Sequence, residues 1–161
     1  MSEDSAAEMR RAAMNWLARR DYAREELARR LSRRFGEQPA LGETLDWLEA
    51  QGFLDEARFA EVFVRNRIER GQGPLRIRRE LEQRGVAEPH LEAALEQAEC
   101  DWFDLARRVR ARRFTRLPGS DPREKARQLR FLQYRGFSAE QAFHALDAGD
   151  AGEEHDPADL S

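Results

Sequence analysis

Apolar residues along this chain recur three and four positions apart, the spacing that places side chains on one face of an α-helix. Met9, Ala12, Ala13, Trp16 and Leu17 follow this spacing near the N-terminus. No stretch alternates apolar and polar residues as a half-buried strand would. Together with the capping residues, prolines and glycines, the pattern predicts nine helices. They are expected to begin near Ser5, Tyr22, Pro39, Asp55, Pro74, Pro89, Trp102, Asp121 and Ser138.

A longer period groups these helices in threes. Leu31, Leu81 and Leu132 each lie in the middle helix of a group, 50 and 51 residues apart. In the last two groups the helix is followed by Gly85 and Gly136, each before an apolar residue, whereas in the first group the glycine is displaced. A glycine in this place typically ends a helix in the left-handed conformation. A fixed period of this size indicates one supersecondary unit used three times.

The expected fold is therefore all-α, with three tandem three-helix repeats forming an elongated, curved array. The predicted repeats cover residues 1–53, 54–99 and 100–147, and an acidic, disordered tail follows over 148–161. One such unit is too small to bury its own apolar face, so neighbouring units are expected to share a core. Arrays of this kind usually present a long surface to a partner and enclose no catalytic pocket.

Composition supports a helical fold. Of 161 residues, Val, Ile and Thr contribute only 8, whereas Ala, Leu, Glu and Arg contribute 88; the first group favours strands and the second favours helices. The single cysteine, Cys100, can form no internal disulfide, which fits a reducing compartment. The chain has no apolar signal core and no apolar run of membrane-spanning length. We therefore expect a soluble, cytoplasmic monomer that does not enter a membrane.

Charge is distributed unevenly. The formal net charge is −3, yet residues 147–161 carry six acids and no base, and residues 107–135 carry ten arginines and one lysine against two acids. Such a block predicts a surface for phosphates or for an acidic protein groove, although a solvated helix face is the alternative. A weaker basic set lies in the second repeat, where acids interrupt it. The candidate contact residues are Arg76, Arg78, Arg79, Arg107, Arg108, Arg110, Arg112, Arg113, Arg116, Lys125, Arg127 and Arg130.

The sequence offers no constellation for catalysis. The three histidines are far apart, no zinc-type ligand spacing occurs, and the loop at residues 71–74 lacks the Lys and Ser/Thr of a P-loop. We expect no enzyme activity, no cofactor and no metal. Phe59 and Phe63 have the spacing of a base-stacking pair, but beside Val62 they fit a core better. Tyr134, between basic residues, is the better candidate for an exposed aromatic side chain.

Three ordered motifs resemble the RecX family of regulators of bacterial recombination. They are G-F-L-D-E-A-R-F-A at residues 52–60, G-P-L-R-I-R-R-E-L-E-Q-R-G-V at 73–86 and K-A-R-Q-L-R-F-L-Q-Y-R-G-F-S at 125–138. The resemblance covers about residues 9–147. The first repeat departs from the family pattern, because Ala23 stands where Ser or Thr is common, and Asp21 is expected to cap that helix instead.

The resemblance implies a non-enzymatic modulator of RecA. Proteins of this family bind the groove of the RecA–DNA filament and restrain its ATPase, strand-exchange and co-protease activities, which affects DNA repair and the SOS response. An array of repeats suits this role, since several weak contacts made at once reinforce each other. The alternative is a helical protein that binds single- or double-stranded DNA directly and acts without RecA.

Overall fold

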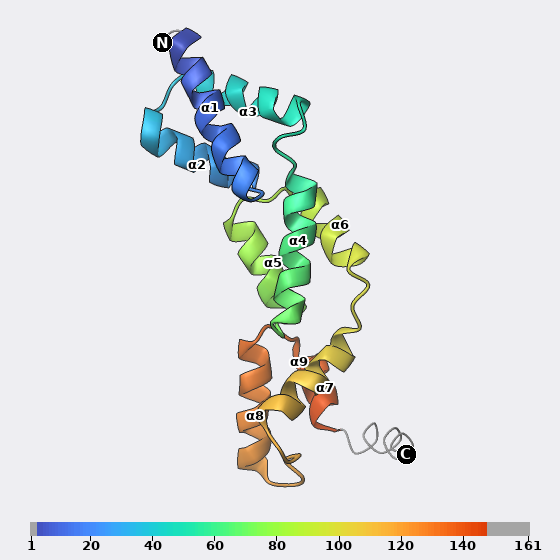
Figure 1. Ribbon diagram of the computed structural model, residues 1–161. Coiled ribbons are helices and arrows are strands. Elements are labelled where there is room, and N and C mark those ends of the chain that lie inside the picture. The colour runs from blue at the N-terminus through green and yellow to red at the C-terminus, as the bar shows by residue number, and fades with distance from the viewer. Residues whose placement is uncertain (1–2, 148–161) are drawn as a thin grey trace. The chain divides into compact units, whose positions relative to one another are not determined.

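The computed structural model describes residues 3–147, and this part of the chain contains nine α-helices and no strand (Figure 1). The all-α prediction is confirmed. The helices are α1 (Glu3–Arg19), α2 (Arg24–Phe35), α3 (Ala40–Ala50), α4 (Glu56–Glu69), α5 (Pro74–Gln83), α6 (Glu88–Gln97), α7 (Trp102–Arg113), α8 (Pro122–Tyr134) and α9 (Ala139–Leu146). The predicted acidic tail over 148–161 lies outside the described residues.

Most helix boundaries follow from local sequence signals. The side chain of Asp121 accepts a hydrogen bond from the Arg123 backbone at the start of α8, and Ser138 and Gln141 form the expected capping box of α9. Gly85 and Gly136 follow α5 and α8 with φ of 79° and 104°. Because these values lie in the left-handed region, where a side chain is strained, the two glycines end their helices as predicted.

The first repeat departs from the sequence-based prediction at its helix starts. α1 begins before Ser5, which therefore lies inside the helix, and its hydroxyl donates to Gln38 Oε1 at 3.0 Å. α2 begins after Ala23, whose backbone N–H donates to the Glu26 carboxylate at 3.2 Å. The prediction that Asp21 caps α2 is therefore wrong. Its carboxylate accepts hydrogen bonds from Arg58, the shortest at 2.7 Å, so a contact 37 residues away replaces the local one.

The leucines that mark the period are core residues. Leu31, Leu81 and Leu132 are each 0% exposed. Phe59 and Phe63 are buried as well, with ring centroids 5.8 Å apart, which confirms a core role over a stacking one. Full burial of a leucine stabilises a fold by roughly 1.5–3 kcal/mol, so these positions set the architecture of the repeats.

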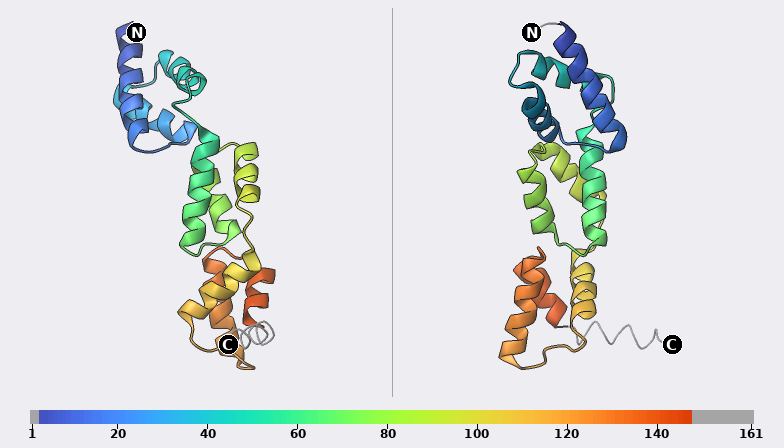
Figure 2. Two further views of the ribbon diagram at one scale, coloured as in Figure 1. Left: turned by 45° about the vertical axis from the view of Figure 1, so that its right-hand side comes forward. Right: turned by 60° about the vertical axis from the view of Figure 1, so that its left-hand side comes forward.

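Contacts divide the chain into two compact units. The first contains the chain up to Val64 and Glu80–Ala98; the second contains Arg65–Arg79 and the chain from Glu99. In the first unit, α1, α2 and α3 pack together around a core that includes Leu27 and Leu48 (Figure 2). In the second, α7, α8 and α9 pack together around a core to which Ile68 of α4 also contributes (Figure 2). The middle repeat thus supplies residues to both units, and the boundaries at 53/54 and 99/100 stay a prediction about the sequence.

Within the first unit, the end of α5 meets the start of α2, a contact that we call the first junction. It is bridged by Glu56, which is 8% exposed. Its two carboxylate oxygens accept hydrogen bonds from the backbone N–H groups of Arg24 (2.7 Å) and Ala87 (2.9 Å). A helix leaves its first N–H groups without intrahelical partners. One carboxylate therefore satisfies such groups at the starts of both α2 and α6.

Within the second unit, the end of α8 meets the start of α5, and this contact is the second junction. Here backbone bonds to backbone directly: the Gly73 N–H donates to the Arg135 carbonyl at 2.8 Å and the Leu75 N–H to the Gly136 carbonyl at 3.0 Å. A Cβ added to Gly73 would lie 2.4 Å from the carbonyl carbon and oxygen of Gly136. Real Cβ atoms do not come this close to backbone, so the contact requires glycine at position 73.

Candidate binding surface of the second unit

The basic residues predicted to bind a partner separate into buried, paired and exposed groups once the helices are packed. Arg110 is buried, with 7% exposure. Its Nη1 donates to Gln128 Oε1 and to the Arg116 carbonyl, both at 3.2 Å. Burial lowers the pKa of this guanidinium. Arg110 therefore holds the connection after α7 in place and does not belong to the contact surface.

Gln128 completes this interior network. It is fully buried, and its Nε2 donates to the Arg116 carbonyl at 3.0 Å and to Glu124 Oε2 at 2.9 Å. A buried amide without partners would be costly, whereas this one is satisfied at both ends. The network fixes the loop between α7 and α8, so the positions of the basic residues around it are defined by packing.

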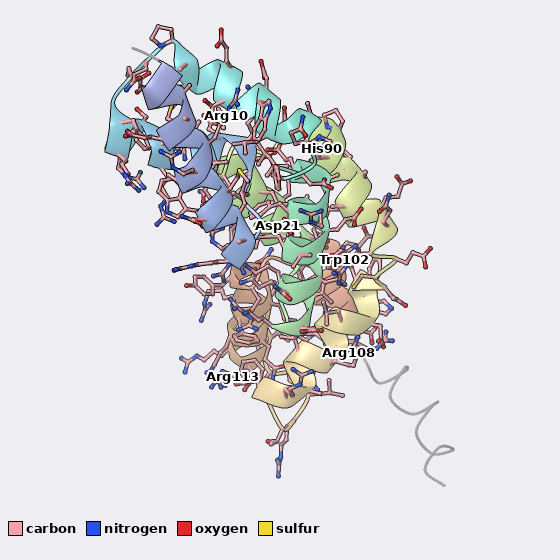
Figure 3. The ribbon with its side chains drawn as sticks, turned by 45° about the horizontal axis from the view of Figure 1, so that its top comes forward. Arg10, Asp21, His90, Trp102, Arg108 and Arg113 are labelled. Carbon is pink, nitrogen blue, oxygen red and sulfur yellow. The ribbon has the colours of Figure 1, made fainter. Side chains whose placement is uncertain are left out.

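Arg107 and Arg108 are exposed to different extents but share one acidic partner. Both guanidiniums contact Asp104, at 3.1 Å and 3.0 Å respectively (Arg108 is labelled in Figure 3). The hydrogen bond from Arg108, followed by the charges of both arginines, lowers the pKa of the Asp104 carboxyl. Part of the positive charge at the start of α7 is therefore neutralised within the helix.

The remaining predicted residues of the third repeat lie on the surface. Arg113 and Arg127 approach the ring of Phe114 from α7 and α8, each 4.9 Å from its centroid, and Arg127 also pairs with Glu124 at 3.0 Å. Such guanidinium–aromatic contacts hold the side chains without neutralising their charge. The exposed basic residues of α7, α8 and the loop between them are Arg108, Arg112, Arg113, Arg116, Arg123, Lys125, Arg127 and Arg130.

The second junction brings the basic set of α5 to the third repeat. The guanidinium of Arg76 lies 5.4 Å from the ring centroid of Tyr134, which is 74% exposed, as predicted. Arg79 is exposed, whereas Arg76 and Arg78 are half-buried. Arg76 and Tyr134, which lie 58 residues apart in the sequence, therefore belong to one surface of the second unit.

Arg135, which the sequence did not single out, stands at the centre of this convergence. It donates to the carbonyls of Arg70 and of Gly71, the latter at 3.4 Å. Burial lowers its pKa, and the neighbouring charges of Arg76 and Arg112 lower it further. The positive charges of Arg76 and Arg112 thus act on the Arg135 guanidinium, and a bound anion would relieve such repulsion.

The described residues hold little that would support other chemistry. No three His, Cys, Asp or Glu side chains within 3–147 lie close enough together to hold a metal ion. Cys100 is half-buried, and burial raises the pKa of its thiol, which makes it less reactive. None of the helices described combines the length and apolar character that crossing a membrane requires.

Three-helix repeats with exposed arginines on the last of them define the class, an all-α repeat protein. Similarity to known proteins narrows the class. Residues 55–95 match the RecX second three-helix domain and residues 99–146 match the RecX third three-helix domain. The chain belongs to the RecX family of regulatory proteins.

Individual relatives agree with this assignment. The chain is 50% identical to the regulatory protein RecX of Halorhodospira halophila, over 98% of this chain and 99% of the relative. It is 42% identical to that of Pseudomonas putida, over 91% and 94%. The crystal structure of RecX from Lactobacillus salivarius shares the fold, with a TM-score of 0.80 at 20% identity, over 93% of this chain and 99% of that one.

Proposed function

We propose that this protein is a non-enzymatic negative regulator of RecA, which binds the RecA–DNA filament and inhibits its ATPase, strand-exchange and co-protease activities. Family membership supports the regulatory role. The observation that carries the contact is the basic surface of the second unit, where arginines of α7 and α8 are exposed and Arg76 of α5 lies beside Tyr134. An acidic protein surface and DNA phosphates both complement such a surface. We further propose that it acts as a cytoplasmic monomer without a cofactor.

The test is inhibition of RecA on single-stranded DNA. Adding the protein in substoichiometric amounts should slow ATP hydrolysis, because one regulator affects many subunits of a filament. Replacing Arg112, Arg113 and Arg116 by Gln should weaken this inhibition without unfolding the protein, since all three are exposed. A matched control replaces three exposed arginines of the first unit, Arg11, Arg19 and Arg33. Unchanged ATP hydrolysis at every ratio of regulator to RecA would refute the proposed function.

A second candidate function is direct DNA binding without RecA, favoured by the exposed arginines of α7 and α8 and by Arg76 beside the exposed ring of Tyr134. Affinity that depends on phosphate contacts falls with salt. With about six contacts, the log–log slope on a single strand would be about −4. A salt-insensitive affinity measured by fluorescence anisotropy would exclude this mode of binding.

A further inference from the structure

One face of α8 carries a regular row of exposed side chains. Arg123, Arg127, Arg130 and Tyr134 are spaced i, i+4, i+7 and i+11, and all four are exposed. At 3.6 residues per turn this spacing keeps them within one narrow stripe of the helix. Eleven residues at 1.5 Å rise give the stripe a length of about 16 Å. We call these four residues the α8 stripe.

The stripe ends at an aromatic ring with an open surface. Tyr134 is 74% exposed, the highest value among the large apolar and aromatic side chains that the structure leaves on the surface. Its ring is adjacent to Arg76, with 5.4 Å between the guanidinium carbon and the ring centroid. An exposed aromatic ring is a platform on which any nucleobase can stack, and a neighbouring guanidinium adds a cation–π contribution.

The charges along the stripe are only partly balanced. Glu124 pairs with Arg127, and Asp121, at the start of the helix, accepts a bond from the Arg123 backbone. Within residues 3–147, neither Arg123 nor Arg130 has an acidic side chain within ion-pair distance. Beside Tyr134 the positive surface continues with Arg76 of α5. The whole track therefore attracts anions along a line and not at one point.

The geometry points to a single-stranded nucleic acid as the ligand of the α8 stripe, with phosphates on its arginines and one base stacked on Tyr134. A stacked strand advances about 3.4 Å per nucleotide, so about five nucleotides span the stripe. An acidic protein would satisfy the arginines but would gain nothing comparable from the ring. This inference rests on the proposed function, which supplies the single strand that the surface meets, but the binding it describes needs no RecA.

The experiment separates stacking from charge. Fluorescence anisotropy measures binding to a labelled oligothymidylate of about fifteen nucleotides, and to an abasic strand of equal length and charge, both without RecA. Replacing Tyr134 by Ala should weaken binding to oligothymidylate about tenfold and leave the abasic strand unaffected, because only a base stacks. Tyr134→Phe keeps the ring and should behave as the unaltered protein.

Replacing Arg123, Arg127 and Arg130 by Gln should weaken binding to both strands and reduce the salt slope by about 2. The control variant with Arg11, Arg19 and Arg33 replaced removes the same charge from the first unit and should leave the slope unchanged. Equal losses on both strands for Tyr134→Ala, or no loss, overturn the inference. So does binding of polyglutamate in place of the oligonucleotide. RecA ATPase inhibition, measured separately on the same variants, reports on the proposed function alone.

Discussion

The middle helices of neighbouring repeats meet twice in the described chain, at the first junction where α5 ends against α2 and at the second where α8 ends against α5. Both contacts place a glycine of positive φ, Gly85 or Gly136, against the first turn of the preceding middle helix. At the first junction a buried carboxylate mediates between the backbones; at the second the backbones bond directly. The two junctions thus place equivalent helix ends in contact but use different hydrogen-bond acceptors, a carboxylate at the first and backbone carbonyls at the second.

The two junctions also differ in the residue that precedes the earlier middle helix. Gly73 leaves room for backbone to approach backbone, whereas Ala23, at the equivalent place 50 residues earlier, has a buried methyl group. At the first junction the N–H groups of Arg24 and Ala87 bond to the side chain of Glu56 and not to a facing backbone carbonyl. A carboxylate accepts stronger hydrogen bonds than a neutral backbone carbonyl does.

The largest expected effect concerns the buried leucine that α5 and α8, the helices ending at the two junctions, have in common. Leu81→Ala and Leu132→Ala should each lower the free energy of unfolding by about 2–5 kcal/mol, because both leucines are fully buried. Thermal unfolding followed by circular dichroism measures the loss. A large effect in one variant and none in the other would show that the repeats do not use these positions equivalently.

Gly73→Ala should destabilise the second junction by about 1–3 kcal/mol, since its new methyl group forces the backbone of Gly136 away. The matched control is Gly42→Ala in α3, where a Cβ meets nothing within 4 Å. That change should instead stabilise the protein by about 0.5–1 kcal/mol, as alanine favours a helix. Equal melting temperatures for the two variants would contradict the close backbone contact.

Glu56→Gln should weaken the first junction by about 1–2 kcal/mol, because an amide offers one oxygen acceptor where the carboxylate offers two. Hydrogen exchange of the Arg24 and Ala87 amides reports the change locally. At least one of the two should exchange faster, while the Gly73 and Leu75 amides of the second junction keep their protection. Uniform acceleration across all four would mean that the junctions are not independent.

The smallest effect concerns the exposed ion pair of the first unit. Arg58→Gln removes the contact with Asp21 and should cost about 0.2–1 kcal/mol at low salt, because water screens exposed pairs. The cost should shrink as salt is raised. Denaturant unfolding at two salt concentrations provides the measurement, and a cost that salt leaves unchanged would assign Arg58 a packing role instead.

Local signals predicted the helices well and the contacts between them poorly. Periodic apolar residues, prolines and the Gly85 and Gly136 stops define nine helices because each signal acts within a turn or two. The position of Glu56 in the first turn of α4 does not predict its role. Its hydrogen-bond donors, the backbone N–H groups of Arg24 and Ala87, are 32 and 31 residues away in the sequence. For the same reason Asp21 was expected to cap a helix and not to pair with Arg58.

Which basic residues contact a partner stays a prediction, whereas their exposure can be compared with the sequence. The dense basic block at residues 107–135 predicted an exposed charged surface, and most of its arginines are exposed. Arg110 was the exception for a reason that the sequence does contain, since it follows Ala106 by four residues and so continues the apolar face of α7. The proximity of Arg76 to Tyr134 accompanies the backbone contact of Gly73 with the end of α8, and nothing in the neighbouring sequence predicts that contact.

The division of the middle repeat has a consequence for dissecting the protein. α4 and α5 each begin in one compact unit and end in the other. A fragment starting at residue 100 would keep a whole sequence repeat but lose Ile68 from its core and the Gly73 and Leu75 partners of the α8 carbonyls. The sequence repeats and the compact units are therefore offset at the middle repeat, so a cut before residue 100 separates the third repeat from part of its own compact unit.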